Sequence, residues 1–135
     1  MIQVWKKFGV VLVLTVTLAT CARQQVVYNV DQDAIPPATQ QKLSSEQVGK
    51  VIAKAALAKG WTVKDIRPGK LHCMLKWRDH TATIDITYSK KEYSIELNSS
   101  ENLQESDGMI HRRYNEYVRN LQNEIDTKLF DAAYN

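Results

Sequence analysis

The residues of this chain with the widest chemical range fall in two short stretches. Arg78, Asp79 and His80 stand together between two alternating segments, and His111 and Asn115 lie one helical turn apart near the C-terminus. Such side chains can contact a ligand or a partner, and imidazoles beside a carboxylate can serve a small hydrolase or bind a metal ion. The same residue types also cap turns and helix ends. The elements that position them therefore have to be placed before a role is assigned.

The first predicted helix begins at a capping box. Ser44 and Gln47 are three residues apart, and Gly60 has the place of a glycine after a helix end. Apolar residues between them recur at helical spacing, which predicts a helix with one buried face. That buried stripe is Val48, Val51, Ile52, Ala55 and Ala56.

From Trp61 onward the apolar residues alternate, which predicts four consecutive strands. Pro68 and Gly69 occupy the centre of a type II turn between the first two. A turn centred on Asp79-His80 would pair Cys73 with Ile86. The inward-facing residues are Leu71, Cys73, Leu75, Trp77, Ala82, Ile84, Ile86, Tyr88, Tyr93, Ile95 and Leu97.

A second turn at Lys90-Lys91 would pair Ile86 with Ile95, and the whole set then forms an antiparallel meander. Neither turn carries Asn-Gly or Asp-Gly, so wider four-residue loops stay possible. The last strand, Tyr93 to Leu97, would be a sheet edge open to strand addition by a partner.

The C-terminal run IHRRYNEYVRNLQNEI predicts an amphipathic helix capped by Ser106 or Asp107. The expected fold is α+β, a two-layer sandwich of order α-β-β-β-β-α with both helices on one face of an antiparallel sheet. It would occupy residues 43–130, with 131–135 as a tail. Strand directions then bring His111 to the end of the sheet that carries Arg78, Asp79 and His80.

The first twenty residues have the three parts of an export signal: Lys6 and Lys7, an apolar core from Phe8 to Leu18, and small residues. An apolar run of about 11 residues is too short to span a bilayer. The stretch Leu18-Ala19-Thr20-Cys21 resembles the lipobox of bacterial lipoproteins, in which the cysteine is acylated. An ordinary signal peptide with a chance cysteine is the alternative.

A multiply acylated Cys21 would hold the protein on a membrane, with palmitate as one of its chains. Ala22 instead of Asp favours the outer membrane, facing the periplasm. Residues 21–42 are polar and contain Pro36-Pro37, so they are expected to form the lipidated cysteine and a flexible tether. An edge strand from Val26 to Val30 is the alternative for part of this segment.

Composition excludes several functional classes. Beyond Lys6 and Lys7 the chain has 16 basic and 15 acidic residues, which argues against a nucleic-acid binder. Cys73 is the only cysteine besides Cys21 and lies on the inward side of its strand, so it is expected to be an inert thiol. The chain lacks a Gly-x-Ser-x-Gly elbow, a His-Glu-x-x-His motif, a Cys-x-x-Cys motif and a phosphate loop, so no catalytic residue, metal or cofactor is predicted.

The segments GWTVKDIRPGKL, RDHTATIDITYSKKEYSIEL, SSENL and IHRRYNEYVRNLQNEI resemble, in order and spacing, a family of small uncharacterised proteobacterial lipoproteins. The likeness covers residues 35–128 and implies shared architecture without an activity. Tyr117 stands where such sequences often have tryptophan.

The predicted function is a lipid-anchored periplasmic binding protein whose partner is an envelope protein or a cell-wall polymer. The predicted binding residues are Arg78, Asp79, His80, His111 and Asn115. Their alternative role is structural, as turn and helix caps. The alternative function is a small hydrolase or metal-assisted enzyme that uses Asp79, His80 and His111.

Overall fold

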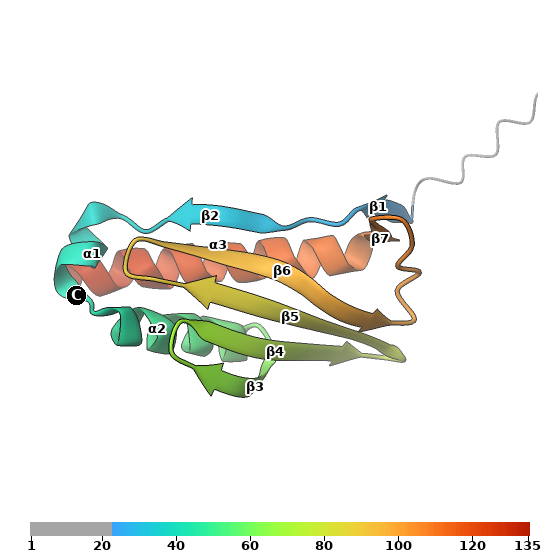
Figure 1. Cartoon of the computed structure of the whole chain (residues 1–135), viewed down its shortest axis with the longest axis horizontal. Helices are drawn as coiled ribbons and strands as arrows, with labels where there is room; N and C mark the ends of the chain where they lie inside the picture. The colour runs from blue at the N-terminus through green and yellow to red at the C-terminus, as the bar shows by residue number, and fades with distance from the viewer. Residues whose placement is uncertain (1–22) are drawn as a thin grey trace, which may run out of the picture.

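A computed structural model describes residues 23–135, so the predicted signal peptide and Cys21 lie outside the described residues. The chain is α+β and its largest element is an antiparallel sheet. The five strands of this sheet lie in the order β2-β6-β5-β4-β3 (Figure 1). They are β2 (Val30–Ala34), β3 (Thr62–Arg67), β4 (Lys70–Trp77), β5 (His80–Tyr88) and β6 (Glu92–Glu101).

Within residues 23–135 three helices accompany the sheet: α1 (Pro37–Lys42), α2 (Ser45–Ala58) and α3 (Arg112–Tyr134). The capping box of α2 is confirmed, since Ser44 Oγ accepts from Gln47 N and Gln47 Oε1 accepts from Ser44 N. The α2 and α3 helices contact each other, and α2 also contacts β3, β4 and β5. The buried apolar residues of these helices and of the sheet form one continuous core.

Two of the predicted turns are confirmed. Gly69 has φ +78° between the paired residues Arg67 and Lys70, as a type II turn requires. In the β5–β6 hairpin, Tyr88 pairs with Tyr93 and Ile86 with Ile95, in the predicted register. The loop of this hairpin is closed by a hydrogen bond from Ser89 N to Glu92 O of 2.9 Å.

The predicted register of the β4–β5 hairpin is wrong by two residues. Trp77 pairs with His80, so the turn consists of Arg78 and Asp79 and Cys73 lies opposite Ile84. Arg78 adopts φ +52°, which lets the chain reverse within two residues. Side chains alternate with period two, so this shift leaves every core residue on the correct face while it changes every cross-strand neighbour.

The expected flexible tether is also wrong for the residues that the structure describes. Residues 24–42 form β1 (Gln24–Val26), β2 and α1, and β2 pairs with β6. Val30 and Ile35 are buried, and the backbone N–H of Ile35 donates to the Lys91 carbonyl at 2.8 Å. The edge from Tyr93 to Leu97 is therefore covered, and β2 and β3 are the edge strands. We call residues 24–42 the N-terminal strap.

The boundaries of the last helix differ from the prediction at both ends. Ile110 and His111 belong to β7 (Met109–His111), which pairs with β1, so α3 begins only at Arg112. Ser106, expected as a cap, forms an isolated bridge with Met109 instead. The expected tail is helical as far as Tyr134, and Ala133 is buried.

Candidate functional site

The end of the sheet brings His80 and His111 together, as strand direction predicted. Their rings stack with centroids 6.2 Å apart and an interplanar angle of 27°. Trp77 lies against His80 with a centroid separation of 5.4 Å and contacts Tyr117 of α3 at 4.7 Å. The two histidines therefore lie in a row of rings that joins the β4–β5 turn to α3.

The polar atoms of this end bind one another. His80 Nδ1 lies 2.6 Å from the Asn102 carbonyl, and Asn102 Nδ2 donates to the Asp79 carbonyl at 2.8 Å. The Asp79 carboxylate is 3.5 Å from His80 Nε2, whereas Arg78 is exposed. These contacts tie the β4–β5 turn to the end of β6, which is the structural role that the sequence left open.

His111 caps α3. Its Nδ1 accepts from Arg113 N at 3.2 Å, which requires a neutral ring with the proton on Nε2. Burial lowers the pKa of His111, and the charges of His80, Arg112, Arg23 and Arg113 lower it further. The neutral cap is thus the form that this environment favours.

Asn115 was predicted as a binding residue, but it is buried and holds the N-terminal strap. Its Oδ1 accepts from Tyr28 N at 2.9 Å. Its Nδ2 donates to the Val26 carbonyl at 2.8 Å and to Gln25 Oε1 at 3.2 Å. It is 1% exposed, both of its amide hydrogens are donated and its Oδ1 already accepts, so Asn115 is a buried structural residue and not a ligand contact.

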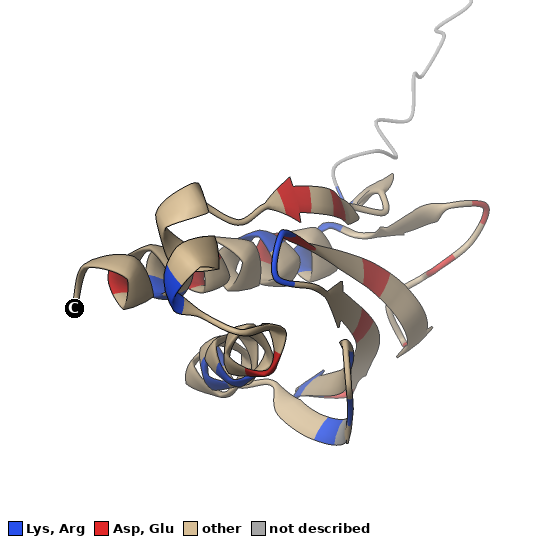
Figure 2. Cartoon of the chain, turned by 60° about the vertical axis from the view of Figure 1, so that its left-hand side comes forward, with Lys and Arg blue, Asp and Glu red and all other residues tan. Residues whose placement is uncertain are grey.

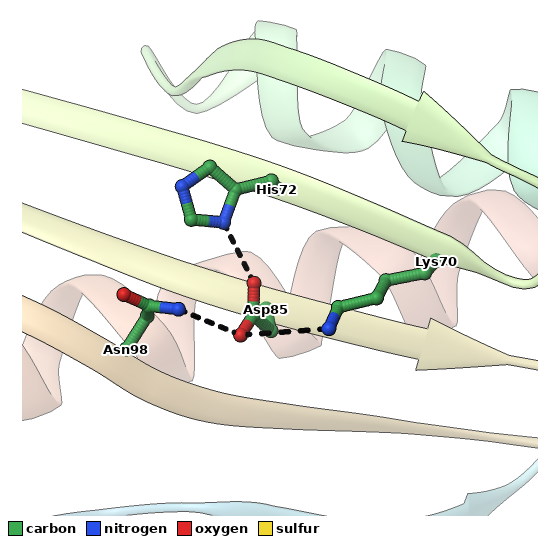
Figure 3. Close-up of polar contacts among 4 residues, drawn as sticks. All are labelled: Lys70, His72, Asp85 and Asn98. Carbon is green, nitrogen blue, oxygen red and sulfur yellow. Dashed lines mark hydrogen bonds and ion pairs between the residues drawn. The ribbon is translucent and has the colours of Figure 1, made fainter.

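A second polar cluster lies on the face of the sheet away from the core (Figure 3). Asp85, in the middle of β5, is 2.7 Å from His72 Nδ1, accepts from Asn98 Nδ2 at 2.9 Å and lies 3.9 Å from Lys70 Nζ. We call Lys70, His72, Asp85 and Asn98 the sheet-face cluster. With Arg67 it lines a recess of about 250 Å³.

The electrostatics of the sheet-face cluster centre on Asp85. Desolvation alone would raise the pKa of this carboxyl, but hydrogen bonds from Asn98 and His72 and the charge of Lys70 outweigh it, so the pKa is lowered. Asp85 is therefore ionised and orients the three side chains around it. On the opposite side of β4, burial and then the Asp85 charge raise the pKa of the Cys73 thiol to about 12, which keeps it inert.

The predicted register concealed this cluster. In the hairpin as it forms, His72 lies directly opposite Asp85, whereas a turn centred on Asp79-His80 would place His72 opposite Thr87. The sequence does indicate that His72 and Asp85 both point away from the core, since both fall between inward-facing residues of their strands. Only the correct turn shows that they are neighbours.

The segment that supplies Arg67, Lys70 and His72 to the recess is basic, although the chain after residue 20 is nearly balanced. Residues 45–77, from α2 through β4, contain seven basic residues and two acidic ones. Acidic residues instead lie on β2 and β6, toward the opposite edge of the sheet from β3 (Figure 2). The basic residues are Lys50, Lys54, Lys59, Lys64, Arg67, Lys70 and Lys76.

Within residues 23–135 no group of three or more His, Cys, Asp or Glu side chains is arranged to hold a metal ion. Asp79, His80 and His111 are engaged in the local contacts described above. No family model, curated protein or solved structure matches the chain. The function of this chain therefore has to be inferred from its residues and their geometry.

Proposed function

We propose that this chain is a lipid-anchored, non-catalytic binding protein of the bacterial envelope, and that its ligand presents an anionic group to the sheet-face cluster. The lipobox-like Leu18-Ala19-Thr20-Cys21 and the resemblance to small proteobacterial lipoproteins support the anchor. Ala22 favours the outer membrane, facing the periplasm. No helix of the described segment, residues 23–135, has the length and hydrophobicity needed to cross a bilayer.

The observation that carries the ligand class is the charge of the recess. Arg67, Lys70 and His72 line it together with only one carboxylate, Asp85. The ring of His72 is held in place through Nδ1, which lies 2.7 Å from the Asp85 carboxylate. These side chains project from paired strands, which position them more rigidly than loops would.

An anionic cell-wall polymer fits this arrangement. Such a polymer repeats its carboxylates, so several weak contacts along one chain combine into stable binding. The strands that supply the recess carry two further lysines, Lys64 of β3 and Lys76 of β4, whose charges add to the positive field and would raise the local concentration of such a ligand. The alternative ligand is a protein with an acidic surface, and binding experiments can tell the two apart.

Two substitutions should change ligand affinity in opposite directions. Lys70→Ala removes a cation and should weaken binding of solubilised peptidoglycan fragments about fivefold. Asp85→Asn keeps an acceptor for His72 but removes the negative charge, so binding should tighten about fivefold. The dissociation constants are measured by chemical-shift titration of the wild type and both variants.

Lys76→Ala is the matched control, because Lys76 is an exposed lysine of β4 outside the recess. It should change affinity much less than Lys70→Ala does. A cationic ligand would reverse both signs, and fragments that shift no resonance of the recess would contradict a cell-wall ligand. Retention of an acidic protein from an envelope extract, lost in Lys70→Ala, would then identify the protein partner.

The anchor has its own test. The wild-type protein should incorporate an alkynyl palmitate analogue and sediment with membranes, because acyl chains supply the apolar surface that holds it there. Cys21→Ala should lose the label and move to the soluble fraction. Labelling that survives Cys21→Ala would exclude lipidation at this residue.

A further inference from the structure

The N-terminal strap is attached to α3 and β6 by a chain of polar groups that runs from the buried Tyr93 and the half-buried Asp33 and Gln122 to Asp126 on the exposed side of α3. Tyr93 of β6 is 1% exposed, and its hydroxyl lies 3.0 Å from Asp33 Oδ2 on β2 and 2.6 Å from Asp126 Oδ1 on α3. Gln122 Nε2 donates to the same Asp33 oxygen at 2.9 Å. Two carboxyl groups therefore meet at one tyrosine.

The number of protons at this junction decides its stability. Tyr93 has one hydroxyl proton, so it can donate to one carboxylate only. If Asp33 and Asp126 were both ionised, the other short oxygen–oxygen contact would join two acceptors and be repulsive. One additional proton on either carboxyl turns both contacts into hydrogen bonds.

We propose that the Asp126 carboxyl holds a proton when the strap is docked, with Tyr93 donating to Asp33 and accepting from Asp126, so that rising pH loosens the strap from α3. The junction then acts as a proton-dependent latch on the segment between Cys21 and the rest of the fold. A released strap would behave as a flexible tether with a reach of roughly 25 Å for about 20 residues.

The environment of Asp126 agrees with this direction. Burial raises the pKa of Asp126, and the neighbouring Asp33 carboxyl raises it further, against the lowering effect of the Tyr93 hydrogen bond. A carboxyl with a raised pKa in the docked state favours docking at low pH and loses that contribution as pH rises through the raised value. Proton loss thus opposes docking.

No cation among the described contacts offsets the two carboxyl groups. Lys128 pairs with Glu124 at 3.3 Å, and Lys59 at the end of α2 pairs with the same glutamate at 3.8 Å. From the strap, Tyr28 donates to Gln122 Oε1 at 2.6 Å, and its ring is covered by Arg119. From α1, Thr39 donates a neutral hydroxyl to the Leu129 carbonyl at 2.8 Å.

The test compares the wild type with Asp126→Asn by hydrogen exchange of the β2 amides at about pH 5 and about pH 8. The amide Nδ2 of asparagine can donate to the Tyr93 hydroxyl, which then donates to Asp33, without any added proton. Protection of Val30–Ala34, corrected for the intrinsic exchange rate, should fall severalfold on going to the higher pH in the wild type. It should be pH-independent in the variant.

Asp131→Asn is the matched control, since Asp131 is an aspartate of the same helix that makes none of the junction's side-chain hydrogen bonds. It should behave like the wild type. His111 also titrates with the opposite sign, but it pairs with Gln24 in β1, so only the β2 amides are compared. Asp33→Asn gives the same expectation from the other side of the junction. Wild-type protection that does not change with pH, or an equal pH dependence in Asp126→Asn and Asp131→Asn, would overturn the proposal.

Discussion

Asn115→Ala is expected to lower the free energy of unfolding by about 3 kcal/mol. The substitution removes one acceptor and two donated hydrogen bonds at a site that is 1% exposed. It also leaves the Tyr28 N–H and the Val26 carbonyl without this partner, and a polar group that loses its hydrogen bond in a half-buried position is costly. Thermal unfolding should show Tm lowered by about 10 °C.

The matched control for this prediction is Asn120→Ala, at an exposed asparagine of the same helix. It should shift Tm by only a degree or two, because it breaks no described strap contact. Hydrogen exchange should show the largest loss of protection in Gln24–Val26 and Val30–Ala34 for Asn115→Ala. Equal Tm values for the two variants would show that Asn115 does not hold the strap.

Gly49→Ala is expected to destabilise the protein even though alanine is the better helix former. A Cβ at Gly49 would overlap the Tyr88 side chain, with Cε2 at 2.8 Å and the hydroxyl closer still. Overpacking of this kind costs about 1–3 kcal/mol, against a gain of about 1 kcal/mol from helix propensity. Urea denaturation measures the difference.

The double-mutant cycle makes this prediction sharp. When Tyr88→Ala has removed the ring, Gly49→Ala should stabilise the protein by about 1 kcal/mol, so the effect changes sign. The coupling between the two positions should then be about 2 kcal/mol. If Gly49→Ala changes the free energy of unfolding equally in both backgrounds, a side chain at position 49 does not collide with the Tyr88 ring.

The α+β class and most of the elements follow from local patterns. The capping box at Ser44 and Gln47 and the glycine at position 69 each specify one local geometry, and both occur where predicted. The alternation of apolar residues identifies the core face of the sheet because a strand can bury only one of its two sides here.

The strap could not be predicted in this way, because its order comes from distant partners. Residues 24–34 are mostly polar, and their sequence is that of a linker. They are held by Asn115, Gln122, Tyr93 and Asp126, none of which is a neighbour in sequence. Asn115 was misassigned for the same reason. An asparagine that holds a distant segment and an asparagine that contacts a ligand look alike in the sequence.

The sheet-face cluster was missed for a different physical reason. The turn at Arg78 and Asp79 requires a positive φ at an arginine, which propensity disfavours, so a wider turn looked equally suitable. Apolar patterning constrains register only modulo two residues. Two registers that differ by two residues fit the apolar pattern equally well, and only one of them pairs His72 with Asp85.

The strap also sets an order of events during folding. Its hydrogen bonds to α3 join residues 87 to 94 positions apart, and its pairing with β6 joins residues about 60 apart. Contacts of such long range form late, because closing the chain between them must come first. The N-terminal strap is thus expected to dock last, and β6 keeps an unpaired edge until β2 has paired with it.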